Sequence, residues 1–167
     1  FINALLEKMV QSPQVAVETK VAMTRSVMDK YVEEIYCTGL RPQMVEEGKK
    51  ICNSVYNLVC KGPDLMALMK RYEEFDPPGY AHLFMTSLFS SVIARSLEWA
   101  GQRTIETMVM GAILHDLGKL KLPKELRDMD FHGMTPTQQE LYKQHPVHGV
   151  EMVRNSPVIT EQIVQII

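Results

Sequence analysis

Apolar residues recur every three or four positions along most of the chain, and Gly and Pro residues interrupt this repeat at wide intervals. Such spacing marks one face of an α-helix, whereas a half-buried strand would alternate apolar and polar residues, a pattern we do not find. The clearest breaks fall at residues 38–42, 61–63 and 75–80, with further ones at Gly101 and at 156–157. The sequence therefore predicts an all-α fold, a bundle of helices.

The first expected helical region covers residues 1–38, with a restart at Ser12-Pro13. Ser is a good N-cap, and Pro suits the first position of a helix. Gly39 can adopt a left-handed turn at the end of this region, and the residue before Pro42 is pushed out of helical geometry. We therefore expect a short helix followed by a long amphipathic one.

The remaining helices are predicted from caps and breaks in the same way. In the helix over 80–99, Met85, Leu88, Phe89 and Val92 are expected to face the core. Gly118 is expected to supply the turn after the fifth helix. The other expected helices cover 42–60, a short segment after Asp64, a buried segment from the cap Thr104 to His115-Asp116, a segment from the capping box Thr135–Gln138 to His145 and then Val153, and a last one after Ser156-Pro157.

Composition limits the classes of protein that fit. The 167 residues, 46% hydrophobic and 23% charged, are those of one ordinary globular domain with an appendage. A net charge of -2 argues against a strongly basic nucleic-acid binder, and no apolar run approaches the roughly 20 residues of a membrane span. Cys37, Cys52 and Cys60 form no CxxC pair, so we expect reduced thiols and a cytoplasmic protein, with Cys52 and Cys60 on one helix face.

The stretch 112–119 carries the strongest chemical signal. An apolar run leads to His115 and Asp116, and Lys119 follows shortly after. Imidazole and carboxylate together suit a borderline metal ion, and an ammonium group suits phosphate. Neighbouring side chains in mid-helix diverge by about 100°, so a His-Asp pair binds one ion better at a helix end, where this pair is predicted. From these residues alone, a metal site and a simple helix cap both stay open.

Two further histidines, His82 and His145, come from other predicted helices and would join this pair if the helix ends meet. Each histidine would bind a metal through one ring nitrogen and need a partner for the other. His132 is interpreted as a surface residue or a satisfied core residue rather than a ligand. His148 lies three residues after His145, on roughly the same helix face, so a supporting role and no role both stay open.

These motifs carry a family resemblance. The chain resembles the HD superfamily of metal-dependent phosphohydrolases, and more narrowly the HD-GYP subgroup, which degrades the bacterial second messenger cyclic di-GMP. The resemblance covers about residue 60 to the end and extends more loosely back to about 42. The helix leading to His-Pro-x-x-Gly distinguishes the HD-GYP type from generic HD domains. The matching residues are His82, His115-Asp116-Leu117-Gly118-Lys119, Pro123, residues 134–140, His145-Pro146 and Gly149.

The resemblance implies a role for each candidate site residue. His82 and His115 would each bind a metal ion, His145 would bind the second ion, and Asp116 would bridge the two. Lys119 would contact a substrate phosphate, so Asp116 and Lys119 are the expected catalytic residues. The implied cofactors are two divalent ions, most often iron or manganese. The implied reaction is attack of a metal-bound hydroxide on phosphorus, which opens the cyclic dinucleotide.

The resemblance is incomplete. The family continues with a His-His-Glu segment, a Gly-Tyr-Pro loop and a further Asp ligand, none of which is in this sequence. We therefore expect an HD domain that lacks its C-terminal part, either because the protein continues past Ile167 or because it is a degenerate relative. These residues alone should show weak or no turnover. Pro78 stands where some members place a Glu for a third ion, so a two-ion site is expected.

Two other functions stay open. A catalytically degenerate HD-like domain would act as a nucleotide- or protein-binding signalling module, and an HD phosphohydrolase for another nucleotide would use the same ligands.

The expected domains are an N-terminal helical extension or interdomain connector over 1–41 and an HD-GYP-like domain over 42–167. The long helix before residue 38 would serve as a connector, as a dimerisation helix, or simply pack on the domain. The expected partners are a cyclic dinucleotide, an upstream sensor domain and a second copy in a homodimer, with no nucleic-acid polymer and no membrane span.

Overall fold

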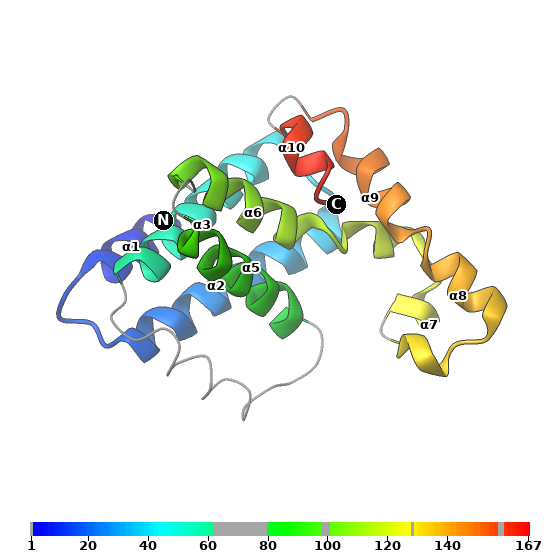
Figure 1. The fold of residues 1–167 in the computed structure, drawn as a ribbon, viewed down its shortest axis with the longest axis horizontal. Helices are drawn as coiled ribbons and strands as arrows, with labels where there is room; N and C mark the ends of the chain where they lie inside the picture. The colour runs from blue at the N-terminus through cyan, green and yellow to red at the C-terminus, as the bar shows by residue number, and fades with distance from the viewer. Residues whose placement is uncertain (1, 62–79, 98–100, 128, 157–158) are drawn as a thin grey trace.

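A computed structural model describes residues 2–61, 80–97, 101–127, 129–156 and 159–167, and Figure 1 shows their fold. These residues form helices and turns without a strand, which confirms the predicted all-α class. The short helix expected after Asp64 lies outside the described residues. The elements are α1 (Ile2–Gln11), α2 (Val17–Thr38), α3 (Pro42–Lys61), α5 (Tyr80–Ser96), α6 (Gln102–Leu114), the 3₁₀ helix η1 (Leu117–Lys121), α7 (Lys124–Arg127), the 3₁₀ helix η2 (Phe131–Gly133), α8 (Pro136–Tyr142), α9 (His145–Val153) and α10 (Glu161–Val164).

Helix α3 is the centre of the bundle, because it contacts α1, α2, α5 and α6. Figure 1 shows α7 and α8 standing away from this bundle, in a lobe over residues 124–142 that we call the α7–α8 lobe. Between the bundle and the lobe, η1 packs along α9. The end of α6, η1 and the start of α9 therefore meet where the lobe joins the bundle.

One apolar core joins the helices of the bundle. Burying each large side chain of this core stabilises the fold by about 2 kcal/mol. Val153 of α9 and Ile163 of α10 extend the same cluster. The N-terminal helices thus pack on the rest of the bundle, and a domain boundary between residues 41 and 42 stays a prediction. Fully buried members from five helices are Leu6, Met28, Leu58, Phe84 and Ile105.

Helix α2 begins at Val17, later than the restart predicted at Ser12-Pro13. The Ser12 hydroxyl oxygen accepts a hydrogen bond from the backbone N–H of Gln14 at 3.3 Å, so it stabilises a turn between helices. The predicted start is wrong because Ser and Pro suit turns as well as helix starts. The predicted end is confirmed, since Gly39 follows α2 with a φ of 77°.

The inner face of α5 differs from the predicted one. Leu88 is buried as expected, but Phe89 is 40% exposed, so that part of the prediction is wrong. Ser87 and Ser91 take the inner face together with Phe84. Each serine hydroxyl donates to the carbonyl oxygen four residues earlier, at 2.7 and 2.6 Å. Because these hydroxyls are satisfied within the helix, Ser87 and Ser91 can face the core, and Phe89 then lies on the outer side of α5.

Helix α6 begins at Gln102, and Gly101 rather than Thr104 is its N-cap. The Gly101 carbonyl accepts from the backbone N–H groups of Thr104 and Ile105, at 3.0 and 3.2 Å. Thr104 is therefore already inside the first turn, and its predicted capping role is wrong. The helix ends at Leu114, next to the predicted end at His115-Asp116, and the predicted burial is confirmed for Ile105 and the second half only.

The last helix is shorter than predicted. It begins at Glu161 after the N-cap Thr160 and ends at Val164, whereas the sequence favoured a start at Ser156-Pro157 and continuation to Ile167. Residues 157–158 lie outside the described part of the chain.

The cysteines and the lengths of the helices test two further predictions. Cys52 is buried, Cys60 packs at the edge of the core, and all three thiols are free. Burial raises the pKa of the Cys52 thiol, so this group stays protonated. Across the described residues, every helix is too short or too polar to cross a membrane.

Helix α8 starts with the predicted capping box. The Thr135 hydroxyl accepts from the backbone N–H of Gln138 at 3.4 Å, and the Gln138 side chain accepts from the backbone N–H of Thr135 at 2.9 Å. We expect Thr135→Ala to lower the free energy of unfolding by about 1 kcal/mol, as measured by urea denaturation. Thr137→Ala, an exposed position within the same first turn, is the matched control and should change it by less than about 0.5 kcal/mol. Equal effects of the two substitutions would contradict the capping role.

Candidate metal centre

Four of the predicted site residues meet at three helix ends. His82 lies in the first turn of α5, His115 follows the last residue of α6, and His145 is the first residue of α9. Asp116 stands between α6 and η1 with a φ of -96° and a ψ of 0°. The backbone changes here from α-helix to 3₁₀ helix. As a result, the adjacent side chains of His115 and Asp116 lie close together, with Nε2 and Oδ1 3.5 Å apart. The predicted convergence is therefore present.

The ligand atoms of these residues lie close together. Asp116 Oδ1 is 3.5 Å from His115 Nε2 and 3.5 Å from His145 Nε2. The Nε2 atoms of His82 and His115 are 3.3 Å apart. Ligand atoms of His82, His115 and Asp116 all lie within 4.8 Å of one another. Asp116 Oδ1 is thus close to both His115 and His145, while the group that could hold one ion consists of His82, His115 and Asp116.

Backbone carbonyl groups fix the chemical form of two histidines. His115 Nδ1 lies 2.7 Å from the Ala112 carbonyl oxygen, and His145 Nδ1 lies 2.7 Å from the Tyr142 carbonyl oxygen. A carbonyl oxygen can only accept, so each Nδ1 carries a proton, and in the neutral ring Nε2 then offers its lone pair. Such a second hydrogen bond is the usual companion of a metal-ligating histidine. In both cases the carbonyl belongs to the residue three positions earlier.

This donor set fits a divalent transition metal. Two ligands that each bind one ion at about 2.1 Å lie roughly 3.0–3.5 Å apart, which matches the separations around Asp116. Imidazole nitrogen with carboxylate oxygen is a combination that suits zinc, iron and manganese better than calcium or magnesium. The residues His82, His115, Asp116 and His145 would hold the metal, and their roles as ligands stay predictions.

Lys119 occupies the other oxygen of the central carboxylate. Its Nζ donates to Asp116 Oδ2 at 2.7 Å, and its side chain is only 17% exposed. Burial lowers the pKa of Lys119, but the hydrogen bond and charge of Asp116, with a contribution from Tyr142, outweigh burial and raise it. Lys119 is therefore protonated and lies beside the candidate centre, while its predicted contact with a substrate phosphate stays a prediction.

Sequence reasoning missed two tyrosines at the site. The Tyr142 ring contacts the His145 ring, with centroids 5.0 Å apart, and Lys119 Nζ lies 5.2 Å from the Tyr142 centroid. The Tyr36 hydroxyl, from α2, donates to the backbone carbonyl of Asp116 at 3.4 Å. The spacing of three residues before His145 was a usable signal for Tyr142, because it repeats the spacing of Ala112 before His115. No local signal pointed to Tyr36.

Gly118 has a different function from the predicted one. It lies inside η1 with a φ that is not positive, and the turn after α6 is formed by His115 and Asp116, so its predicted role in that turn is wrong. A Cβ atom at this position would collide with the carbonyl group of His145 and the backbone nitrogen of Gly149. Gly118 is therefore needed because the backbones of η1 and α9 touch, and this contact sets His145 beside Asp116.

The remaining two histidines contact residues other than the four ligand candidates. His148 Nδ1 is 3.6 Å from Glu151 Oε2, on the exposed side of α9. His132 is exposed in η2, and its ring packs edge-on against Phe131 at 6.0 Å. The structure thus gives His148 a neighbour other than the candidate centre.

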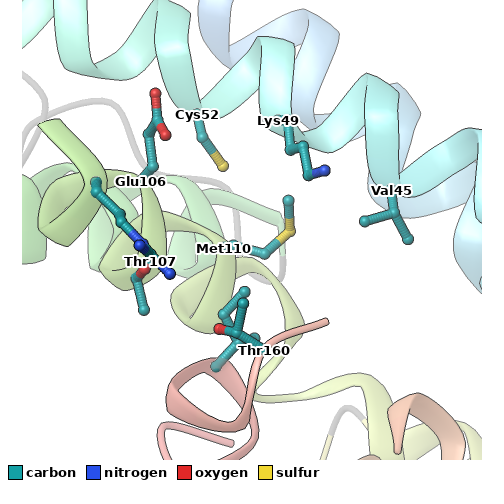
Figure 2. Close-up of a pocket in the computed structure, with 9 residues that line it drawn as sticks. Val45, Lys49, Cys52, Glu106, Thr107, Met110 and Thr160 are labelled. Carbon is teal, nitrogen blue, oxygen red and sulfur yellow. The ribbon is translucent and has the colours of Figure 1, made fainter. Parts of the chain in front are cut away.

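A cavity of about 190 Å³ lies between α3, α6 and α10, as Figure 2 shows. Val45, Met110 and Ile163 form much of its apolar wall, and Lys49 and Glu106 are among its charged lining residues. The predicted site residues do not line it. The cavity and the candidate metal centre are therefore separate features of the described structure, and both involve α6.

Comparison with known proteins gives two matches to this architecture. The family model described as HD domain matches residues 79–167. Among solved structures, the chain is similar to Bd1817, an HDG"Y"P protein from Bdellovibrio bacteriovorus, with a TM-score of 0.74 and 15% identity. The alignment covers 96% of this chain and 53% of that chain, so the chain spans about half the length of this relative. At this identity the likeness shows the fold. No curated protein matches the chain.

Proposed function

The chain belongs to the HD domain family, and from this we propose that it is a metal-dependent phosphodiesterase that hydrolyses cyclic di-GMP. One observation carries the proposal: Asp116 Oδ1 lies 3.5 Å from the Nε2 atoms of both His115 and His145. A carboxylate oxygen within 3.5 Å of two imidazole nitrogens is suited to bridging two ions. The resemblance of the fold to an HDG"Y"P protein supports the choice of subgroup.

The proposed metals are two divalent ions, iron or manganese. Bound there, they would polarise the phosphodiester and activate water for in-line displacement at phosphorus. His82 and His115 would hold one ion and His145 the other, with Asp116 shared between them. The chain's own contribution is to fix both Nε2 lone pairs through the carbonyls of Ala112 and Tyr142.

Lys119 would bind the substrate phosphate. Its ammonium group is protonated and already sits beside Asp116, so a small rotation of the side chain would present it to an anion near the same carboxylate. The substrate class, a cyclic dinucleotide, rests on the resemblance to the HD-GYP subgroup and on the likeness of the fold to an HDG"Y"P protein.

The test is hydrolysis under single-turnover conditions, with metal-loaded protein in excess over cyclic di-GMP, since this detects weak activity. We expect cleavage to a linear dinucleotide with manganese or iron, and none after chelation by EDTA. Parallel reactions with a cyclic mononucleotide and a nucleoside triphosphate separate this substrate from others. Preferential cleavage of either of those compounds would show that the substrate is another nucleotide and not cyclic di-GMP.

One observation favours a signalling module as the second candidate function. The four described ligand residues offer four side-chain donors, which is few for two ions that each take four to six ligands. Metal analysis of purified protein discriminates between the candidates. Near-stoichiometric manganese or iron supports the enzyme, whereas protein that stays metal-free after loading supports the binding module.

A further inference from the structure

We propose that Tyr142 is a positioning residue that holds both His145 and Lys119 at the candidate metal centre. The proposal rests on the proposed function only in taking this centre as a metal site. Tyr142 is the last residue of α8, and a two-residue link separates it from His145 at the start of α9. This short link keeps the end of the α7–α8 lobe near the start of α9, and the contacts of Tyr142 place it against the candidate centre.

The first argument concerns His145. The Tyr142 carbonyl accepts the His145 Nδ1 proton at 2.7 Å, and the two rings pack at 64° with centroids 5.0 Å apart. The carbonyl fixes which nitrogen is protonated, and the ring limits rotation of the imidazole. Together they aim Nε2 at Asp116, 3.5 Å away. A histidine held in one orientation loses less entropy when it binds an ion.

The second argument concerns Lys119. Its Nζ lies 5.2 Å from the Tyr142 ring centroid while it donates to Asp116 Oδ2. A cation over an aromatic face is attracted by the ring, and more strongly where water is largely excluded. The Lys119 side chain is 17% exposed, so this attraction acts in a partly dry environment. One ring thus orients a ligand candidate and the neighbouring cation together.

The third argument is that the Tyr142 ring is itself held in place. Phe131 packs against it with centroids 5.7 Å apart and an angle of 55°. The Gln139 side chain donates to the carbonyl oxygens of Phe131 and Met134, at 3.2 and 3.3 Å, which ties η2 to α8. Contacts within the α7–α8 lobe therefore support the Tyr142 ring from behind. Without the ring, the lobe would no longer touch His145 through an aromatic contact.

The test compares Tyr142→Phe, which keeps the ring, with Tyr142→Leu, which removes it. Leu141→Ala is the matched control, because Leu141 is the neighbouring residue of α8 and is 42% exposed. We would follow the His145 Nδ1 proton by NMR in metal-free protein, and then titrate Mn²⁺ by calorimetry. Tyr142→Leu should speed exchange of this proton with water and weaken Mn²⁺ binding, each by about 10-fold. In Tyr142→Phe and Leu141→Ala, both the exchange rate of this proton and the Mn²⁺ affinity should stay within about twofold of wild type.

Two results would overturn the proposal. One is a Tyr142→Leu protein that exchanges the His145 proton at the wild-type rate. The other is a Tyr142→Phe protein whose proton exchange and Mn²⁺ affinity change as much as those of Tyr142→Leu, which would assign the effect to the hydroxyl group. Tyr142→Phe also provides a test if the leucine variant fails to fold. The proton readout needs no metal, so an absence of Mn²⁺ binding by wild type would refute the proposed function and leave this test intact.

Discussion

Replacing Asp116 by Asn is expected to weaken Mn²⁺ binding by at least about 100-fold and to reduce cyclic di-GMP hydrolysis to background. Asp116 contacts both neighbouring histidines through Oδ1 and holds Lys119 through Oδ2. The amide is isosteric, so the helix ends keep their positions, but the negative charge that would neutralise a cation is lost. Calorimetric titration with Mn²⁺ measures the first effect, and single-turnover hydrolysis measures the second.

The matched control is Asp130→Asn. Asp130 is exposed in the turn before η2, and the same change of charge there should leave Mn²⁺ affinity within about twofold of wild type. Equal Mn²⁺ affinity of Asp116→Asn and wild type would contradict the assignment of Asp116 as the central ligand. Equal losses of Mn²⁺ affinity in Asp116→Asn and Asp130→Asn would indicate a general effect of net charge.

The helices of the bundle were largely predictable, while the starts of several were not. Ser12 and Thr104 are both good capping residues, yet one stabilises a turn and the other lies inside a helix. An N-cap residue is still in extended geometry while the residues after it are helical, and Gly101 satisfies this condition with a ψ of 176°. Thr135 was predicted correctly because Pro136 and Gln138 add two independent signals for the same start.

The candidate centre was predictable as a set of residues. His82, His115 and His145 each stand at a helix end, where a side chain can point away from its own helix. What brings them together is packing between segments, and packing was not visible in the sequence. The aromatic contact of Tyr142 depends on the angle between α8 and α9, which a two-residue link alone does not define. Tyr36 reaches Asp116 from a helix 80 positions earlier in the chain.

Gly118 shows why a single residue type can mislead. Glycine is favoured where φ is positive, and equally where two backbones must touch. Sequence alone could not separate these two causes, and the structure assigns the second. The difference has a measurable consequence, because a backbone that blocks a Cβ atom cannot move aside as a side chain can.

Gly118→Ala is therefore expected to lower the free energy of unfolding by about 3 kcal/mol, measured by urea denaturation. The added Cβ would meet the His145 carbonyl and the Gly149 backbone nitrogen, so η1 and α9 must separate. This cost outweighs the gain of about 0.4–1 kcal/mol that alanine brings by restricting the unfolded chain. The same separation moves His145 from Asp116, and Mn²⁺ binding should weaken by about 10-fold.

Two other glycines provide graded controls. At Gly133 a Cβ would meet no atom within 4 Å, so alanine there should be neutral or slightly stabilising. At Gly149 the nearest atom is Ile167 Cγ2, 2.9 Å away, which belongs to a side chain and can shift more easily than backbone. The expected order of destabilisation is Gly118→Ala, then Gly149→Ala, then Gly133→Ala. If Gly118→Ala were as stable as Gly133→Ala, η1 and α9 would be able to separate freely, and their contact could not be what places His145 beside Asp116.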